Sequence, residues 1–333
     1  MTTSIQTNRR KPAILAGLAT LALTAWLGIA NATTYPDSGV RIVVGSAPGG
    51  TTDAMARLLA TGLSKKWRQS VTVENRAGAA GTIATEFVAL SKPDGKTLLM
   101  ASPSHTLAAS LMTTLKYDPF KSFAPITMTT TYPPYLVVNS DRVPVKSVAE
   151  LFTYVKANPG KVNYGTAGKG SGQYRNFQTL IKMTGLKMQE IAYSGGTPVM
   201  VALAGGEIDL TFAPLIQINS SANPEKLRIL GVTSAQRSPV TPNVPSIAET
   251  EGMSAFDEYE WHGLLAPAGT PNDVAQKIRD DVAEMLKDPK ILSAVSALGL
   301  IPKVNSPEEF SKFVEADVLK WNTFAQELKL KGK

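Results

Sequence analysis

The sequence contains no cysteine and only two histidines, His105 and His262. Without cysteine the chain cannot form a disulfide, a cysteine metal site or a thiol nucleophile. The two histidines lie far apart in the sequence and do not suggest a set of zinc ligands, so we expect no metal and no cofactor. Stability must then come from core packing, for which 333 residues with 43% hydrophobic side chains are sufficient.

Charge is also scarce, at 18% of residues with a formal net charge of +7. No run of basic residues with interleaved aromatics occurs, so we expect no nucleic-acid partner. The mild positive balance suits a small anionic ligand. The length predicts two domains of ordinary size, and we expect a monomer.

The first 32 residues differ from the rest of the chain. A basic start at residues 9–11 precedes an almost wholly apolar run at 13–30, and Ala30-Asn31-Ala32 fits a small-x-small cleavage site. This order predicts a signal peptide over residues 1–32 that is cleaved after Ala32. A membrane anchor is the alternative, although the apolar run is near the lower length limit for a span. The Arg9-Arg10 pair raises twin-arginine export, but Lys11-Pro12 follows where a large apolar residue is usual.

The stretch from residue 41 to residue 66 organises the first half of the mature chain. Apolar β-branched residues at 42–44 predict a buried strand, and Pro48-Gly49-Gly50 predicts a sharp turn after it. A helix to about residue 68 follows, which Thr51, Thr52 or Asp53 could cap. A glycine-rich turn that opens a helix leaves backbone N–H groups free for an anion. An ordinary strand-to-helix turn is the alternative interpretation of this stretch alone.

Strands and helices alternate through most of the sequence. Strands are expected at residues 71–74 and 98–101, and helices at 82–90 and 107–112. This alternation predicts an α/β fold with a parallel sheet, in which ligands bind at the carboxyl ends of the strands. Two apolar strands split by Pro133-Pro134 then suggest a crossing into a second domain, and residues 258–266 suggest the return.

Two glycine-rich loops, one in each half, are the main functional signal: loop 1 (residues 45–53) and loop 2 (residues 165–172). Loop 2 is not a P-loop, because its spacing is two residues short and Gly170 stands where Ser or Thr is required after Lys169. It is not a dinucleotide fingerprint either, because Gln173 occupies the place of the third glycine or alanine. We expect the two loops to face each other across a cleft and to offer N–H donors to an anion.

An exported α/β hydrolase is the enzyme alternative. Its nucleophile elbow would be Ala192-Tyr193-Ser194-Gly195-Gly196, which misses the required first glycine. Neither histidine follows an acidic partner in the expected order. His105 lies in a Ser/Thr-rich loop where it could line the cleft, and we expect His262 beside Trp261 to be a packed hinge residue. We therefore predict a binding protein and not an enzyme.

Eight short motifs are spread over nearly the whole mature chain. They are Pro48-Gly49-Gly50-x-x-Asp53-x-x-Ala56-Arg57, Glu74-Asn75-Arg76-x-Gly78-x-x-Gly81, Lys92-Pro93-Asp94-Gly95, Asn163-Tyr164-Gly165 with Gly170-Ser171, Tyr193-Ser194-Gly195-Gly196-x-Pro198, Gly205-Gly206-x-x-Asp209, Thr233-Ser234-x-x-Arg237-Ser238-Pro239 and Trp261-x-Gly263-Leu264-x-Ala266-Pro267-Ala268-Gly269-Thr270-Pro271. These motifs resemble those of the substrate-binding proteins of tripartite tricarboxylate transporters, the Bordetella uptake gene (Bug) family. Each motif is short, but eight in order are specific.

The resemblance implies a periplasmic protein of the type II binding-protein fold, with two domains, each a mixed sheet flanked by helices, and a ligand cleft between them. Domain 1 would comprise residues 33–134 and 262–333, and domain 2 residues 135–261, with hinge strands near 131–138 and 258–266. The implied function is capture of a small carboxylate for integral-membrane permease subunits of a tripartite transporter. The same binder acting as a sensor for a signalling partner is a further alternative.

The resemblance and the loops together predict a set of ligand-binding residues. They are Ala47, Pro48, Gly49, Gly50, Thr51, Asp53 and His105 in domain 1, and Thr166, Ala167, Gly168, Lys169, Gly170, Ser171, Tyr174, Arg175, Gly195, Thr197, Pro198, Ala213 and Pro214 in domain 2. Tyr174 replaces a histidine that the family often has, and this ring with the guanidinium of Arg175 beside it could suit a second carboxylate or an aromatic acid.

Overall fold

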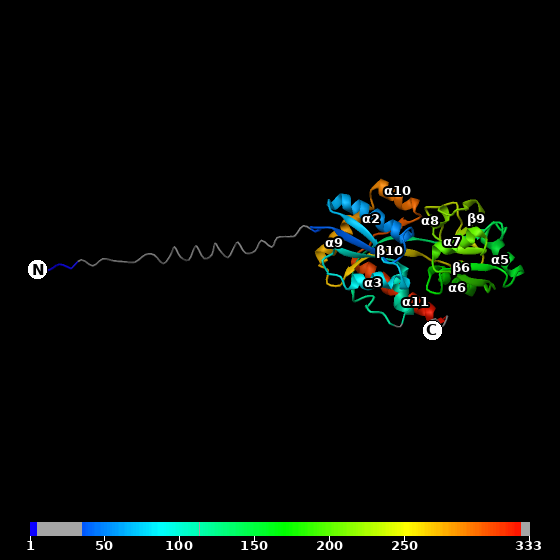
Figure 1. Ribbon diagram of the computed structural model, residues 1–333, viewed down its shortest axis with the longest axis horizontal. Helices are drawn as coiled ribbons and strands as arrows, with labels where there is room; N and C mark the ends of the chain where they lie inside the picture. Colours follow the sequence, from blue (N-terminus) through cyan, green and yellow to red (C-terminus); the bar gives the residue numbers. More distant parts are fainter. Residues whose placement is uncertain (5–34, 113, 328–333) are drawn as a thin grey trace. The chain divides into compact units, whose positions relative to one another are not determined.

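The computed structural model describes residues 1–4, 35–112 and 114–327. Met1–Asp37 form one unit, and Ser38–Lys333 form a second compact unit that holds every helix and strand discussed below (Figure 1). The predicted signal peptide and its cleavage site after Ala32 fall almost entirely outside the described residues. Within the described part, no helix combines the length and apolarity that crossing a bilayer requires.

A mixed six-stranded sheet is built from both ends of the chain. Its strand order is β11-β4-β10-β3-β1-β2. The bounds are β1 Val40–Val44, β2 Val71–Asn75, β3 Thr97–Ala101, β4 Phe123–Tyr132, β10 Glu260–Pro267 and β11 Ile301–Pro302. Strands β1, β2 and β3 run parallel, so their carboxyl ends share one edge of the sheet, while β10 is antiparallel to both β3 and β4.

A five-stranded sheet is built from the middle of the chain, in the order β7-β6-β8-β5-β9. The bounds are β5 Tyr135–Asn139, β6 Asn163–Thr166, β7 Gln189–Ala192, β8 Leu210–Ala213 and β9 Leu227–Val232. Pro133 and Pro134 separate β4 of the first sheet from β5 of the second, as the sequence predicted. The α/β class with two mixed sheets is confirmed, whereas the division into domains at 134/135 and 261/262 stays a prediction.

Helices flank both sheets; in Figure 1, α5, α6 and α7 surround β6 and β9. The bounds are α2 Thr51–Trp67, α3 Thr82–Ala89, α4 Pro103–Leu111, α5 Val148–Ala157, α6 Gly172–Thr184, α7 Gly196–Gly205, α8 Leu215–Asn219, α9 Asn272–Met285, α10 Pro289–Ala297 and α11 Pro307–Glu327, with short 3₁₀ turns η1 Ala79–Gly81, η2 Pro224–Lys226 and η3 Ile247–Glu249. Helix α3 lies within one residue of its expected bounds, and α2 ends one residue before the expected end at about residue 68.

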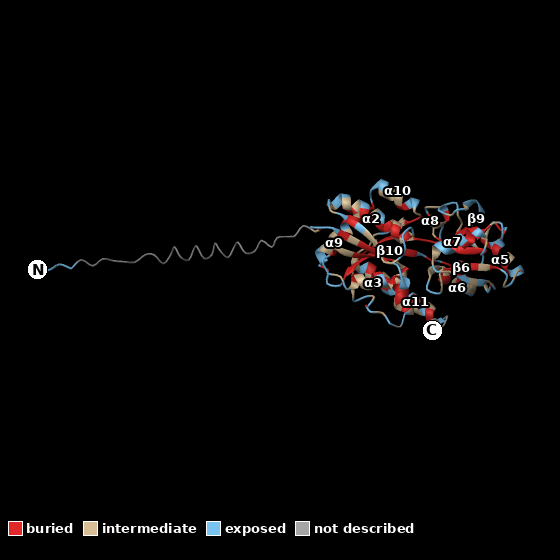
Figure 2. Cartoon of the chain, viewed as in Figure 1, coloured by how far each residue is buried: buried red, intermediate tan, exposed pale blue. Residues whose placement is uncertain are grey.

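Each sheet is buried on its faces by apolar side chains (Figure 2). In β5, Leu136 and Val138 belong to one core cluster and Tyr135 and Val137 to another, because successive side chains of a strand point to opposite faces. The six-stranded sheet packs Trp261 of β10 against Phe310 of α11, with ring centroids 5.7 Å apart. These cores fix the sheet edges at which the loops lie.

Three local predictions were wrong. Residues 103–106 form the first turn of α4 and not a loop, because Pro103 suits the start of a helix. Thr51, Thr52 and Asp53 do not cap α2: Gly50 is the N-cap and contributes no side-chain hydrogen bond. The two-residue strand β11 and the five-residue helix α8 were not expected, because elements so short contain too few residues to show a periodicity.

Candidate functional site

Loop 1 follows β1 and leads into α2, as its glycines predicted. Gly49 has φ +92°, a conformation that glycine adopts without strain. The Gly49 N–H donates to Asp53 Oδ2 at 3.0 Å, and the Asn75 side chain donates to Asp53 Oδ1 at 2.9 Å. Asp53 therefore folds loop 1 back onto the start of α2 and does not occupy the first-turn N–H groups of the helix.

The charge of Asp53 is balanced within the loop. Arg57 Nε donates to Asp53 Oδ2 at 2.9 Å, one turn further along α2. Burial raises the pKa of the Asp53 carboxyl group, but the hydrogen bonds from Arg57, Gly49 and Asn75 outweigh it and hold that pKa below its usual value. With its carboxylate paired in this way, Asp53 repels an incoming anion less than a free carboxylate would.

A cavity of about 510 Å³ opens where loop 1 meets α7 and α8. Loop 1 contributes Pro48 and Gly49, and α7 contributes Thr197 from its first turn. The remaining lining residues are Met200, Val201, Ala204, Gly205, Ile216, Gln217, Ser220, Ser221, Ala222 and Asn223. Both α2 and α7 start at a glycine N-cap without a side-chain hydrogen bond. The first turn of α7 lines the cavity through Thr197, whereas the cavity is lined next to α2 by Pro48 and Gly49 of the preceding loop.

Two polar atoms at this cavity have no hydrogen-bond partner within the described residues. They are Gln217 Oε1 and Ser221 Oγ, and both atoms are buried. The Gln217 amide lies against Gly196 at the start of α7, where an added Cβ would be 3.1 Å from Nε2. A buried polar atom without a partner is uncommon in a folded protein.

Loop 2 joins β6 to α6, again as predicted, but it lines a different part of the structure. Its Thr166 hydroxyl donates to Glu190 Oε1 at 2.6 Å, and the Gly168 N–H donates to Thr166 Oγ1 at 3.0 Å. Ser171 caps α6 by accepting a hydrogen bond from the Tyr174 N–H at 3.2 Å. Residues 166–171 do not line the 510 Å³ cavity. The facing of loops 1 and 2 across a cleft therefore stays a prediction.

Arg175 is placed in the interior rather than at a loop surface. Its side chain is 2% exposed, and its Nη2 lies 3.1 Å from Glu258 Oε2 and 3.7 Å from Glu260 Oε1. The guanidinium also stacks over the Trp321 ring at 4.5 Å. Two carboxylates and a ring already occupy this cation, so we do not carry Arg175 into the proposed ligand site. Tyr174 is likewise buried, edge-on to Phe324.

Neither histidine is placed for catalysis. His105 lies in α4 and contacts the Pro119 carbonyl oxygen through Nε2 at 3.0 Å, and burial lowers its pKa to about 4. It borders a space of only about 20 Å³ behind loop 1, which is room for about one water molecule. His262 is fully buried with Nδ1 2.9 Å from Thr130 Oγ1, and burial lowers its pKa to about 3. The prediction that His262 is a packed residue of the return strand is confirmed.

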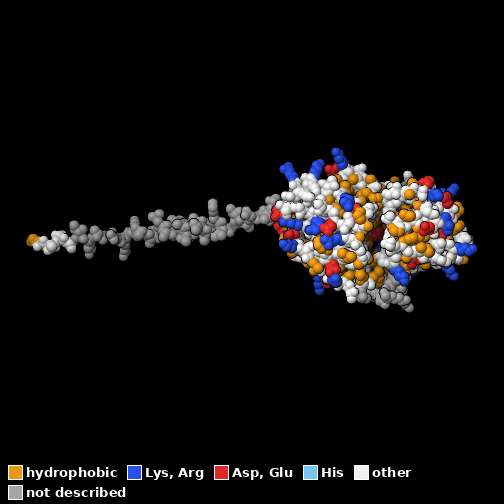
Figure 3. Space-filling view, viewed as in Figure 1, with side chains coloured by type: hydrophobic (Ala, Val, Ile, Leu, Met, Phe, Trp, Pro, Cys, Tyr) orange, Lys and Arg blue, Asp and Glu red, His pale blue; other side chains and the backbone are white. Residues whose placement is uncertain are grey.

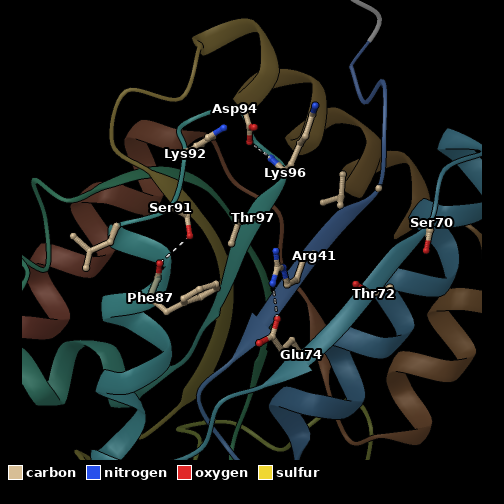
Figure 4. A pocket seen from close by; sticks show the side chains of 13 residues that line it. Arg41, Ser70, Thr72, Glu74, Phe87, Ser91, Lys92, Asp94, Lys96 and Thr97 are labelled. Carbon is tan, nitrogen blue, oxygen red and sulfur yellow. Dashed lines mark hydrogen bonds and ion pairs between the residues drawn. The ribbon is translucent and has the colours of Figure 1, made fainter.

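A second cavity, of about 930 Å³, lies at the outer edge of the six-stranded sheet (Figure 4). Arg41 of β1 and Glu74 of β2 point toward each other there and form an ion pair at 2.9 Å. Phe87 of α3 lies beside this pair, with Arg41 Cζ 5.6 Å from its ring centroid. None of the predicted ligand residues lines this cavity, so its size does not make it the candidate site.

Four further predicted residues lie at or just before the starts of helices α7 and α8. Gly195 is the N-cap of α7, and Pro198 lies in the first turn of that helix. Ala213 is the buried last residue of β8, and Pro214 is the N-cap of α8. Within the described residues, no group of three or more histidine, aspartate or glutamate side chains could hold a metal ion.

Comparison with known proteins identifies the family. The family described as tripartite tricarboxylate transporter family receptor matches residues 55–330. The chain belongs to this family. It is 32% identical over 305 residues to the protein BugT of Bordetella pertussis, which covers 91% of this chain and 93% of BugT.

Solved receptors of similar structure agree with the assignment. Rpa4515 of R. palustris, solved with adipate, has a TM-score of 0.81 and 31% identity, and the match covers 88% of this chain and 97% of that one. MatC of Rhodopseudomonas palustris, solved with malate, has a TM-score of 0.76 and 29% identity, and the match covers 87% and 99%. The predicted Bug-type family and binding-protein fold are confirmed, and the family is one of transport receptors.

Sequence reasoning missed the α7–α8 wall of the receptor's cavity. Met200, Val201 and Ala204 read as ordinary apolar positions of a buried helix, and Gln217 lies in a helix too short to recognise. One signal was available: Pro214 after a strand marks a helix start.

Proposed function

We propose that this receptor captures a small carboxylate and delivers it to the integral-membrane permease subunits of a tripartite transporter. The observation that carries the proposal is one cavity that is lined both by Pro48 and Gly49, which precede the uncapped start of α2, and by Thr197 in the first turn of the uncapped helix α7. A carboxylate accepts several hydrogen bonds at once, and backbone N–H groups at a helix start also carry the positive end of the helix dipole.

The relatives support the ligand class. Rpa4515 with adipate and MatC with malate both hold small carboxylates. Backbone donors recognise the carboxylate group itself and leave the rest of the molecule free to vary, which suits a family with different acids as ligands. Gln217 beside Gly196 would add a side-chain amide donor to the backbone donors of α7.

The enzyme alternative receives no support from the site. Hydrolysis at Ser194 would require a base in contact with its hydroxyl, yet the described hydrogen bonds of His105 and His262 go to Pro119 and Thr130. A sensor role would use the same binding site. It differs from transport in the partner of the ligand-bound protein, which is a signalling protein instead of a membrane permease. We propose the transport role because the matched family is named for a transporter.

Location follows from the same proposal. A receptor that feeds a membrane permease from outside the cytoplasm must be exported, and residues 1–32 carry the basic, apolar and small-residue pattern of a signal peptide. We propose a periplasmic protein that is cleaved after Ala32.

A pair of substitutions at Thr51 tests the role of the helix donors. Thr51 is the first residue of α2 and follows Gly50 at φ −82°, ψ 173°, a conformation that tolerates a following proline. Thr51→Pro removes one N–H group that no helical bond uses, whereas Thr51→Ala keeps that group and removes only the hydroxyl beside Tyr132. We expect Thr51→Pro to bind the acid identified in a thermal-shift screen ten- to a hundredfold more weakly than Thr51→Ala.

The measurement is isothermal titration of both variants with the acid that most raises the melting temperature of the parent protein. Equal affinities of Thr51→Pro and Thr51→Ala would remove α2 from the site. A screen in which no mono-, di- or tricarboxylate raises the melting temperature would overturn the carboxylate proposal as a whole.

A further inference from the structure

The 510 Å³ cavity extends along one face of helix α7. Thr197, Met200, Val201, Ala204 and Gly205 recur at three- and four-residue steps, so one whole face of α7 forms a wall. Loop 1 meets this wall at its first turn. From Thr197 to Gly205 the helix rises about 12 Å, so the cavity continues well past the place where a carboxylate would sit.

No charged side chain lies among the described residues that line this cavity. Beyond the helix starts the walls are apolar, from Met200, Val201 and Ala204 on α7 and Ile216 on α8. Val201 is 68% exposed in the middle of α7, which is unusual for a large apolar residue of a helix that is otherwise well buried. The polar groups present are neutral, and two of them, on Gln217 and Ser221, are the unpartnered atoms described above.

We propose that the groove between α7 and α8 holds the uncharged body of the ligand, and that the ligand is therefore an amphipathic monocarboxylate with a chain or ring of several carbons. This inference rests on the proposed carboxylate site at the starts of α2 and α7 and specifies its ligand.

Electrostatics favours binding of a monocarboxylate over a dicarboxylate in this groove. A second carboxylate placed along α7 would lose its hydration among apolar side chains and would meet no cation on the walls of the groove. The same side chains favour a methylene chain, because each buried methylene is stabilised by removal from water. The affinity of the groove for an acid should therefore rise with the length of its carbon chain and fall when the far end of that chain carries a charge.

A homologous series of acids tests the inference directly. The purified protein is titrated with propionate, hexanoate and octanoate, and with adipate and suberate, which have the same chain lengths but a second carboxylate. We expect affinity to rise about two- to fourfold for each added methylene between propionate and octanoate. We expect hexanoate to bind at least tenfold more tightly than adipate, and octanoate at least tenfold more tightly than suberate.

Two matched substitutions locate the effect. Val201→Asp places a charge in the groove, and Leu319→Asp makes the same kind of change at a residue of α11 that is 66% exposed and does not line the cavity. We expect Val201→Asp to weaken octanoate binding at least tenfold, and by a larger factor than it weakens the binding of propionate, which is too short to extend along α7. Leu319→Asp should change neither, and retained propionate binding shows that a variant is folded.

The outcomes separate this inference from the proposed function. If no acid of either series binds, and the broader screen also fails, the carboxylate site itself is wrong. If acids bind but affinity does not rise with length, or the dicarboxylates bind as well as the monocarboxylates, the site stands and the inference about the groove is overturned. Equal effects of Val201→Asp and Leu319→Asp on octanoate would overturn it too, and would leave the groove to a protein partner.

Discussion

Glu260 is a buried carboxyl group at the first residue of β10, where the chain returns to the six-stranded sheet. The pKa of Glu260 is raised to about 7, chiefly by burial; Arg175 and Lys320 oppose this shift, and the nearby carboxyl groups of Asp317 and Glu258 add to it. Tyr132 of β4 also faces it, and the pKa of that phenol is raised by burial and by the Glu260 charge. Glu260 Oε1 lies so close to Gly172 that an added Cβ there would be 1.9 Å away.

The shifted pKa predicts a pH-dependent stability. The folded protein holds the Glu260 proton up to about pH 7, whereas a glutamate of the unfolded chain loses it near pH 4.5. Stability from this group is therefore lost as pH rises from about 4.5 to about 7, and is constant above that. Glu260→Gln cannot ionise, so we expect the free energy of unfolding of the variant to gain on the parent across this window, by roughly 1–3 kcal/mol.

Urea denaturation of both proteins at several pH values between 4.5 and 8 measures this difference. Glu251→Gln, which changes an exposed carboxyl group, serves as the control. Parallel pH profiles for Glu260→Gln and the parent would show that Glu260 is ionised throughout and that Arg175 dominates its environment.

Strand β10 and helix α11 show how one glycine sets the packing of two elements. An added Cβ at Gly263 would lie 2.2 Å from Phe310 Cζ. The Phe310 ring is fully buried and is held edge-on to Trp261, so it has no free direction in which to move. The register of β10 against β4 shifts between His262 and Gly263, which places the glycine at an irregular point of the strand.

We expect Gly263→Ala to lower the free energy of unfolding by about 1–3 kcal/mol, because overpacking forces a buried ring or the strand out of position. Gly205→Ala is the matched control, since nothing lies within 4 Å of its added Cβ. Chemical denaturation of the two variants gives both values. A loss of stability for Gly205→Ala equal to that for Gly263→Ala would contradict the packing argument.

Elements were predictable where their residues carry a local signal. Strand β2 at Val71–Asn75 and helix α3 at Thr82–Ala89 were expected within one residue of their observed bounds, because β-branched runs and glycine-containing turns act within a few residues. Predictions of the element ends that glycine and proline mark were right because these residues also act on the backbone next to them. The start of α4 was wrong, since Ser and Thr suit both a loop and a first helical turn.

At the scale of the whole molecule, export precedes function. Ala30 and Ala32 hold the small positions of the predicted cleavage site. We expect the intact mass of the periplasmic protein to correspond to a chain that begins at Thr33. Ala30→Glu should block cleavage and leave the uncleaved chain in the membrane fraction, while Asn31→Glu at the tolerant middle position should be processed normally. A periplasmic mass that includes residues 1–32 would contradict the predicted signal peptide.

The sequence by itself determined the elements and much of loop 1. Its glycines, Pro48 and Asp53 act on their own neighbours, so their positions predicted a turn with free N–H donors before α2. The alternation of strands and helices likewise predicted an α/β fold, because hydrophobic periodicity is a local property of the chain. It predicted a parallel sheet, whereas both sheets are mixed, as the family resemblance implied.

Only the tertiary structure decided which residues share the cavity. Gln217 and Val201 line it together with Pro48 because two sheets and their helices bring distant segments side by side, and no local signal encodes that proximity. Arg175 shows the reverse: beside a ligand loop in the sequence, it is turned inward by Glu258, Glu260 and Trp321. A buried cation needs partners more than it needs solvent, and those partners come from segments more than 80 residues away.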